Sequence, residues 1–435
     1  MSLRIGDTTI ERLLVVGFGL TGRAVCRYAA RHGMRVTVSE QRTLTADERA
    51  WLVAHGASVE EGGHTSEALD SVDAVILSPS VPMASPLVAD AIRRGIPVHS
   101  ELDLAALACA GRPIVGVTGT NGKSSTVALI GELLRLRGWN APVVGNVGAP
   151  FIDVADEAER YDAFVVEASS YQLEQSVAFH PQVGVLLNLE PDHLVRHGSM
   201  EAYRAAKGRL FRLQTTDDVA ILPSALACRF PEGEARRVVF DEEPIAMPAG
   251  AKQLSPHQRA NLRAALCASE ALLPEERSED IPVEAIVAAL RLPHRMEPIG
   301  TANGVCVIDD SKATNPASTI AALRATEGPI VLLLGGQAKR AGYEPLVGAI
   351  DAAEIRRIVL FGDAAERLAE ILIGCPVERA ADVEEAARVG LTLARPGDTL
   401  LFSPACASFD AFASFEERGE AFARAVRAMP GFRAD

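Results

Sequence analysis

The ten-residue stretch GVTGTNGKSS, Gly116–Ser125, decides how the middle of this chain folds. It follows the apolar run 113–117 and precedes a long helical pattern of apolar residues. A strand that turns through glycines into a helix is typical of a phosphate-binding loop, because backbone N–H groups and the helix N-terminus face the anion. The usual first glycine falls at Val117, but a simple glycine turn does not explain Lys123 followed at once by Ser124. We therefore predict a nucleotide site here.

The amino-acid composition limits which classes of protein this nucleotide site can belong to. The chain has 435 residues, a formal net charge of -14 and 7 cysteines with no Cys-x-x-Cys pair. The charge disfavours nucleic acid and acidic membranes as partners, and the cysteine pattern disfavours disulfides and structural zinc. No apolar run approaches the roughly 18 residues of a membrane span, and the N-terminus lacks the pattern of a signal peptide. We expect a soluble, cytoplasmic, monomeric protein without membrane insertion.

Strand and helix patterns alternate along the whole chain, which predicts an α/β fold in three domains. We expect a Rossmann-like domain at 1–101, a central P-loop domain with a parallel sheet at 102–292, and a C-terminal Rossmann-like α/β domain at 293–435. Turn residues and short valine-rich pieces at 223–250 suggest a small accessory sheet in the central domain.

A second glycine motif lies near the N-terminus. Gly17, Gly19 and Gly22 form a G-x-G-x-x-G between a strand pattern and a helix pattern, and Glu40 ends the next strand pattern. This spacing is typical of dinucleotide sites, where the acid binds a ribose. Taken alone, the motif is equally compatible with another nucleotide or with a tight structural turn.

Several polar residues follow strand patterns of the central block. Glu167 ends one strand beside the phosphate loop, and with Ser124 it forms a natural magnesium ligand pair. His193 ends the next strand at the same sheet edge, where a histidine is more often functional than structural. Lys207 lies on the helix pattern 199–211, and its residue type alone favours a solvated surface lysine.

The third block suggests another anion site. Asp309, Asp310 and Lys312 follow a strand pattern, and Arg295 lies at the expected boundary between domains. Acidic, basic and hydroxyl groups after parallel strands are typical of ligand loops. Cys406 has no accompanying histidine motif, so we interpret it as a packing residue.

Motifs spread along the chain carry a resemblance to a known family. TGTNGKSS, VVEASSYQLE, PDHLVRHGSMEAYRAAKGRLF, LPHRMEP, DDSKATNP and SPACASFDAFASFEERG occur in this order. Together they resemble the Mur ligase family of peptidoglycan synthesis, from Gly17 to Gly419. Within the family, the resemblance is strongest to members that add D-glutamate to UDP-N-acetylmuramoyl-L-alanine.

The resemblance implies a role for each matching position. It assigns the ATP phosphates to Gly119, Thr120, Asn121, Gly122, Lys123, Ser124 and Ser125. It assigns further ATP contacts to Gln258, Asn261, Arg295 and Asp310. It places the uridine diphosphate at Leu20, Thr21, Glu40 and Arg42, and the muramoyl group near Asn146 and His193. It places the incoming amino acid among Lys312, Thr314, Lys339, Ser408, Phe409 and Phe415.

The resemblance also implies two magnesium sites. Ser124 and Glu167 match one site, and His193 with a carbamate on Lys207 matches the other. The carbamate reverses the surface interpretation, because it converts a repelling cation into an oxygen ligand suited to a hard metal. Lys123, Glu167, His193 and Lys207 are therefore the expected catalytic residues.

The implied reaction is ATP-dependent amide formation through an acyl phosphate, with UDP-N-acetylmuramoyl-L-alanine and D-glutamate as substrates. The loop AKRAGY differs from common family loops, so L-glutamate or another amino acid stays an alternative. Gln258 stands where relatives often have asparagine, Ser80 where they often have glycine, and Val195 where they often have an acid. A nicotinamide-dependent oxidoreductase is the alternative of a different class, as is an ATP-driven regulator without synthesis.

Overall fold

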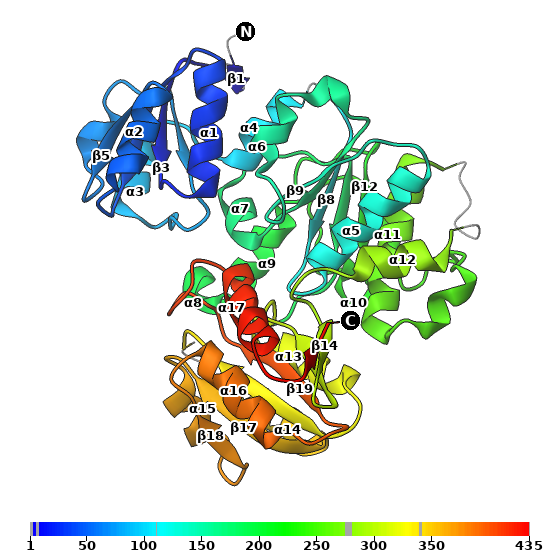
Figure 1. Ribbon diagram of the computed structural model, residues 1–435. Helices are drawn as coiled ribbons and strands as arrows, with labels where there is room; N and C mark the ends of the chain where they lie inside the picture. The colour runs from blue at the N-terminus through cyan, green and yellow to red at the C-terminus, as the bar shows by residue number, and fades with distance from the viewer. Residues whose placement is uncertain (1–2, 6–7, 110, 275–280, 339–341, 435) are drawn as a thin grey trace. The chain divides into compact units, whose positions relative to one another are not determined.

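The computed structural model describes residues 3–5, 8–109, 111–274, 281–338 and 342–434 (Figure 1). The chain divides into two compact units, Met1–Leu290 and Arg291–Asp435. The first unit contains a five-stranded and a six-stranded sheet, and the second unit contains a seven-stranded sheet. Each of the three predicted α/β blocks therefore has a sheet of its own.

The N-terminal sheet is parallel, with the strand order β5-β4-β3-β6-β7. Its strands are β3 (Arg12–Val16), β4 (Arg35–Glu40), β5 (Ala57–Glu61), β6 (Ala74–Leu77) and β7 (Val98–Ser100). The helices of this block are α1 (Leu20–Arg31), α2 (Ala46–Ala54) and α3 (Pro86–Arg93). Two short strands, β1 (Leu3–Ile5) and β2 (Thr8–Ile10), pair antiparallel before them. The G-x-G-x-x-G motif forms the turn from β3 into α1, as its spacing predicts.

The central sheet is also parallel, with the order β13-β12-β11-β8-β10-β9. Its strands are β8 (Ile114–Thr118), β9 (Val143–Gly145), β10 (Phe164–Glu167), β11 (Val183–Leu186), β12 (Val219–Leu222) and β13 (Arg236–Val239). Its helices are α4 (Glu101–Ala108), α5 (Lys123–Leu136), α6 (Phe151–Ala155), α7 (Ser170–Gln175), α8 (Leu194–His197), α9 (Met200–Gly208), α10 (Ser224–Ala227), α11 (Pro256–Leu272) and α12 (Val283–Leu290).

The prediction of a separate accessory sheet at 223–250 is wrong. The strand formed there, β13, pairs parallel with β12 and so extends the central sheet. Its valines supply an additional strand for the same core, because Val238 packs in the cluster that also contains Val183 and Ile221. A valine-rich segment indicates a strand but not which neighbour the strand will join.

Both faces of the central sheet are buried, which explains its continuous apolar strands. Val115 and Val165 face the core shared with α5, α11 and α12, whereas Ile114, Phe164 and Val166 face the opposite core (Figure 1). The carboxyl ends of β8, β10 and β11 meet at one edge, because these strands are parallel neighbours. The loops that follow these strands carry the predicted phosphate and metal residues.

The second unit has a mixed sheet with the order β18-β17-β16-β19-β15-β14-β20. Its strands are β14 (Glu297–Ala302), β15 (Val305–Asp309), β16 (Ile330–Gly335), β17 (Ile355–Phe361), β18 (Val377–Arg379), β19 (Thr399–Ala405) and β20 (Phe432–Arg433). β14 pairs antiparallel with β15 and β20, and the other pairings are parallel. Its helices are α13 (Pro316–Ala325), α14 (Glu344–Ala352), α15 (Ala365–Ile371), α16 (Val383–Leu393) and α17 (Phe415–Arg427).

The α/β fold with parallel sheets is confirmed. The change from the first unit to the second comes after Leu290, close to the predicted boundary at 292. The division at 101 stays a prediction. Among the described residues, no helix combines the length and apolar character needed to cross a membrane.

Candidate active site

The loop between β8 and α5 has the backbone of a phosphate cradle. Gly119 and Gly122 have φ angles of 157° and 84°, which favour glycine. A Cβ on Gly122 would lie 2.6 Å from Oδ1 of Asn261, so α11 packs directly against the loop. Ser124 and Ser125 lie buried in the first turn of α5. The N-terminus of this helix therefore points its N–H groups into the loop.

Two lysine side chains meet at this loop. Nζ of Lys123 donates to the carbonyl oxygens of Gly119 and Thr120, at 2.9 Å each. Nζ of Lys207 donates to the same Gly119 oxygen at 2.8 Å. The charge of Lys123 at this loop suits the phosphates of a nucleotide.

The surface interpretation of Lys207 from residue type alone is wrong, because its exposed fraction is 1%. Helix α9 carries it beneath the phosphate loop, with Nζ 4.7 Å from the ring centroid of Tyr203. Burial, followed by the charge of Lys123, holds the pKa of Lys207 well below its usual range, and Asp192 and Glu167 partly oppose this. A buried lysine with a lowered pKa is a reactive amine rather than a solvated cation.

Glu167 ends β10 and is completely buried. Nδ2 of Asn146, in the segment that follows β9, donates to Oε1 of Glu167 at 2.8 Å. The backbone N–H of Asn146 also donates to the carbonyl oxygen of Glu167, at 2.9 Å. The structure therefore brings together Asn146, Glu167, Lys123 and Lys207, which the sequence placed on four separate segments.

His193 lies at the start of α8 in a left-handed conformation, with φ of 54°. Its backbone N–H donates to Oδ1 of Asp192 at 2.8 Å, which supports this unusual conformation. Nδ1 of His193 lies 3.1 Å from the hydroxyl of Tyr171 on α7. Such a bond to one ring nitrogen selects the tautomer and orients the other nitrogen. The sequence offered no signal for Tyr171, because this contact joins two helices.

Two of the predicted ATP contacts, Gln258 and Asn261, lie on α11. Asn261 packs on Gly122, as described above, and Gln258 lies in the first turn of the helix. Oε1 of Gln258 accepts from the N–H of Ser255 at 3.0 Å, in a capping box that fixes the start of α11. The amide oxygen of Gln258 is therefore engaged by the helix cap.

The N-terminal block contains a cavity of about 590 Å³ at the carboxyl edge of its sheet. Leu20, Thr21 and Glu40, which the sequence predicts to contact uridine diphosphate, line it. Gly17 and Gly19 of the glycine motif and Ser80 also line it. The sequence alone did not single out the other lining residues: Phe18, Gln41, His64, Ser78, Pro79, Val81, Pro82, Ser85 and Pro86. Most of them come from loops after β3 and β6, which the topology brings together.

Arg42 is not among the residues that line this cavity. Its guanidinium pairs with Glu48, through contacts of 2.8 Å and 2.7 Å. The carboxylate of Glu40 accepts from the backbone N–H of Phe18 at 2.6 Å. Glu40 thus fixes the glycine turn of β3–α1, and the predicted contact of Arg42 with uridine diphosphate stays a prediction.

In the second unit, Asp310 lies close to Arg295, because its carboxylate binds the backbone of the next residue, Met296. Oδ2 of Asp310 accepts from Ser403 at 2.7 Å, and Oδ1 accepts from the N–H of Met296 at 3.2 Å. Burial raises the pKa of Asp310 to about 7, and the charge of Arg295 acts against this rise. Because Arg295 lies between His294 and Met296, both with positive φ, its backbone is held in a strained turn.

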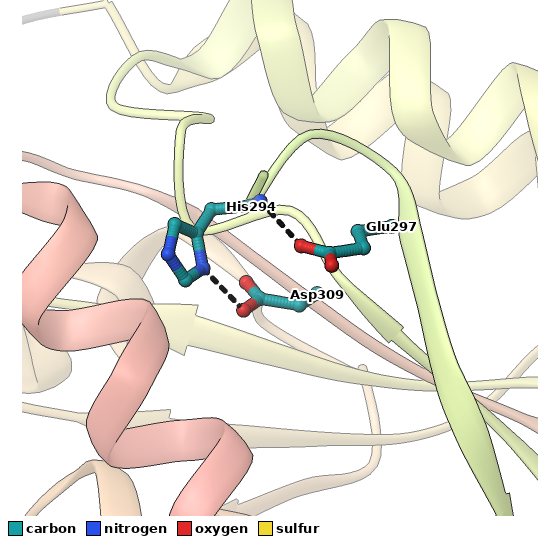
Figure 2. A group of neighbouring side chains, drawn as sticks. All are labelled: His294, Glu297 and Asp309. Atoms are coloured by element: carbon teal, nitrogen blue, oxygen red, sulfur yellow. Dashed lines mark hydrogen bonds and ion pairs between the residues drawn. The ribbon is translucent and has the colours of Figure 1, made fainter. Parts of the chain in front are cut away.

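Three ligand-type side chains meet beside that turn (Figure 2). Nδ1 of His294 lies 2.7 Å from Oδ2 of Asp309, and the N–H of His294 donates to Oε2 of Glu297 at 2.7 Å. A Cβ on Gly419 would lie 2.2 Å from Nδ1 of His294, so α17 packs tightly against the ring. The group therefore holds the backbone that presents Arg295.

Two of the residues predicted to bind the amino acid, Lys312 and Phe415, meet at the start of α17. Nζ of Lys312 lies 3.9 Å from the ring centroid of Phe415, and the N–H of Thr314 donates to the Lys312 carbonyl at 2.8 Å. Ser408 is buried, whereas Phe409 is 66% exposed. Lys339 lies outside the described residues.

A buried arginine, Arg418, connects these loops and was missed by sequence reasoning. Its guanidinium donates to the carbonyl oxygens of Ser311, Cys406 and Ala407, at 2.7, 2.9 and 3.1 Å. Burial lowers the pKa of Arg418 to about 10. Cys406 is itself buried, as expected of a packing residue.

Three protein-family profiles match successive parts of the chain. Residues 11–100 match the Mur ligase MurD-like N-terminal domain, residues 117–232 the Mur ligase middle domain, and residues 294–406 the glutamate ligase domain of Mur ligases.

Curated proteins and solved structures agree with these profiles. UDP-N-acetylmuramoylalanine--D-glutamate ligase of Syntrophotalea carbinolica is 36% identical over 97% of this chain and 98% of its own length. The protein of the same name from Anaeromyxobacter dehalogenans is 40% identical over 95% and 96%. The structure of MurF ligase from Thermotoga maritima with ADP has a TM-score of 0.59 at 16% identity, covering 91% of this chain and 95% of its own. MurC from the same organism has a TM-score of 0.55 at 18% identity, covering 96% and 99%.

Proposed function

This chain belongs to the Mur ligase family, and we propose that it is an ATP-dependent ligase that joins D-glutamate to UDP-N-acetylmuramoyl-L-alanine in peptidoglycan precursor synthesis. The observation that carries this proposal is the convergence of Lys123 and Lys207 on the carbonyl of Gly119, beside the buried Glu167. This combination suits the transfer of a phosphoryl group to a carboxylate. The relatives that carry this activity in their names match nearly the whole chain.

ATP is expected at the phosphate loop, Gly119–Ser125, with further contacts to Gln258 and Asn261. The loop supplies backbone N–H groups, and Lys123 supplies the charge that stabilises the transferring phosphoryl group. Arg295 and Asp310 of the second unit are proposed as further ATP contacts. Each carboxylate oxygen of Asp310 already accepts one hydrogen bond, from Ser403 and from the N–H of Met296, so the orientation of the carboxylate is fixed.

Magnesium is proposed at two places in the first unit. Ser124 and Glu167 would hold one ion, and His193 with a carbamate on Lys207 would hold the other. The residues present fit this proposal, since carbamate formation needs a neutral amine and burial lowers the pKa of Lys207. A hard cation neutralises phosphate charge when bound. The hydroxyl of Tyr171 would orient the His193 ring through its contact with Nδ1 of His193.

The chemistry follows from these placements. The carboxylate of UDP-N-acetylmuramoyl-L-alanine attacks the γ-phosphate of ATP, and an acyl phosphate and ADP form. The amine of D-glutamate attacks the acyl carbon, the tetrahedral intermediate collapses, and inorganic phosphate leaves. Lys123 stabilises negative charge in the first step, and exclusion of water protects the acyl phosphate.

D-Glutamate is proposed to bind in the second unit. Its two carboxylates need cationic and hydroxyl partners, which Lys312, Lys339, Thr314 and Ser408 can supply. Phe409 and Phe415 would contact its aliphatic part. The cavity of about 590 Å³ in the N-terminal block, called the uridine cavity below, would hold the nucleotide end of the other substrate. The nucleotide-linked substrates suit action in the cytoplasm, and the monomeric state stays a prediction.

The test is amide formation measured with each possible amino acid. Purified protein is incubated with ATP, magnesium, UDP-N-acetylmuramoyl-L-alanine and one amino acid from a panel that includes both enantiomers of glutamate. We expect release of ADP and phosphate with D-glutamate, and a product with the mass of the D-glutamyl amide. Preferential use of L-glutamate would overturn the substrate and leave the ligase chemistry. Absence of an amide with every amino acid would overturn the ligase and favour an ATP-driven regulator.

The nicotinamide-dependent oxidoreductase has no support beyond the first glycine motif. The cavity at this motif is lined by Glu40, whose carboxylate is bound to the N–H of Phe18. A nicotinamide enzyme also leaves the phosphate loop and Glu167 without a purpose. Tight binding of NAD, with no binding of UDP, would reverse this preference.

A further inference from the structure

The wall of the uridine cavity is held by side chains of the central block. Residues 78–82 form part of this wall. Nε2 of Gln175, at the end of α7, donates to the carbonyl oxygens of Ser78 and Val81, at 3.2 and 2.8 Å. Gln175 is 1% exposed, so these bonds are shielded from water. The shape of this wall therefore depends on α7.

Arg196 on α8 makes a second connection to the same wall. Nη1 and Nη2 donate to the carbonyl oxygens of Ser80 and Val81, at 3.1 and 2.7 Å. Its Nε donates to Oε2 of Glu174 at 3.0 Å, and its side chain is 10% exposed. A guanidinium that makes several directed bonds fixes the positions of both segments.

Arg196 also contacts the side chain that holds His193. Its guanidinium carbon lies 5.0 Å from the ring centroid of Tyr171, and the Tyr171 hydroxyl lies 3.1 Å from Nδ1 of His193. Arg196 comes three residues after His193 in the chain. One arginine thus bonds to the cavity wall and stacks on the tyrosine that orients a proposed metal ligand.

We propose that Arg196 is a positioning residue that couples occupation of the uridine cavity to the phosphate and metal end of the active site. A ligand in the cavity fixes the carbonyls of Ser80 and Val81. When these carbonyls shift, the guanidinium of Arg196 shifts with them, because it is hydrogen-bonded to both. The ring of Tyr171 then moves with Arg196, and this changes the orientation of the His193 ring. By linkage, a nucleotide with magnesium at the phosphate loop changes the affinity for uridine diphosphate by the same factor. This inference rests on the proposed function, because it takes both sites from it.

The coupling is measured with UDP and without turnover. Calorimetry gives the Kd of UDP for the full chain, alone and with saturating magnesium and a non-hydrolysable ATP analogue. For the wild-type protein, we expect the two Kd values to differ about fivefold or more. Arg196→Met should weaken UDP binding about tenfold, because the carbonyls of Ser80 and Val81 lose their donor. It should also bring the two Kd values within about twofold of each other.

Three further variants separate coupling from stability. Tyr171→Phe keeps the ring beneath Arg196 and removes the hydroxyl, so it should lose the coupling and keep the UDP affinity. Arg196→Lys keeps the charge but loses the fork of donors, and it should restore part of the UDP affinity. Arg135→Met is the matched control, because Arg135 pairs with Glu132 on α5 and should change neither quantity.

The outcomes distinguish this inference from the proposed function. The coupling is overturned if the two Kd values of UDP are equal in the wild-type protein, or if Arg196→Met keeps the wild-type ratio of these Kd values. In either case, UDP binding itself supports the proposed substrate. Failure of the wild-type protein to bind UDP overturns the substrate site and the coupling together. If Arg135→Met also makes the two Kd values of UDP equal, general destabilisation accounts for the effect and the coupling is overturned.

Discussion

Replacement of Asp310 by asparagine should stabilise the second unit at alkaline pH. Burial raises the pKa of this carboxyl from 3.8 to about 7, so the folded state favours the neutral acid. The contribution of Asp310 to stability is complete below pH 3.8 and is lost as the pH rises through about 7. Asparagine is neutral at every pH and escapes this loss.

The magnitude follows from the size of the shift. At about 1.36 kcal/mol for each pH unit, the rise corresponds to about 4 kcal/mol above pH 7. We expect about 2 to 4 kcal/mol of added stability at pH 8, decreasing to near zero at about pH 3. Asparagine can keep both contacts: its oxygen accepts from the N–H of Met296, and its amide donates to Ser403.

The assay is native-state hydrogen exchange of the peptides that contain β15 and β19. Both tryptophans, Trp51 and Trp139, lie in the first unit, so their fluorescence does not report on this one. Protection is measured between pH 4 and pH 8 in the full chain, after correction for the intrinsic exchange rate. Steady-state kinetics of the same variant should show a raised KM for ATP.

Asp398 supplies a control of opposite sign in the same sheet. A hydrogen bond from Arg356 lowers the pKa of Asp398, so its charged form stabilises the fold. Asp398→Asn should therefore reduce protection at pH 8. Unchanged or reduced protection in Asp310→Asn at pH 8, or a gain that persists at pH 4, would refute the reasoning.

Other substitutions test the rest of the site. Lys123→Ala should lower turnover by more than tenfold with the fold intact, because it removes charge from the phosphoryl transition state; retention of a tenth of the wild-type rate contradicts that role. Lys207→Ala should be nearly inactive and partly restored by short carboxylic acids, and activity without rescue, or labelling of an ordinary amine in the native protein, argues against the carbamate. Gly419→Ala should destabilise the second unit by about 1 to 3 kcal/mol, because its methyl group meets the His294 ring. Exchange protection checks this against Gly348→Ala, where open space predicts little or no loss.

Local chemistry made the phosphate loop and the fold class predictable from the sequence. Closely spaced glycines, an apolar strand pattern before them and a Lys-Ser pair after them are properties of one short segment. The alternation of strand and helix patterns likewise indicated three α/β blocks. Glu167 ends β10 as expected, because its apolar strand pattern is local. His193 was expected to end the next strand, but β11 ends at Leu186 and His193 lies at the start of α8.

Other features were decided by tertiary structure. Lys207 reads as a surface residue on its own helix, and only the packing of α9 beneath the phosphate loop buries its amine. The strand at Arg236–Val239 reads as part of a separate sheet, and its pairing with β12 places it in the central one. Arg196 and Arg418 carried no local signal, because each bonds to backbone carbonyls that lie far along the chain, such as those of Ser80 and Ser311. Every residue has a carbonyl group, so the sequence identifies no partner for such an arginine until the fold brings the segments together.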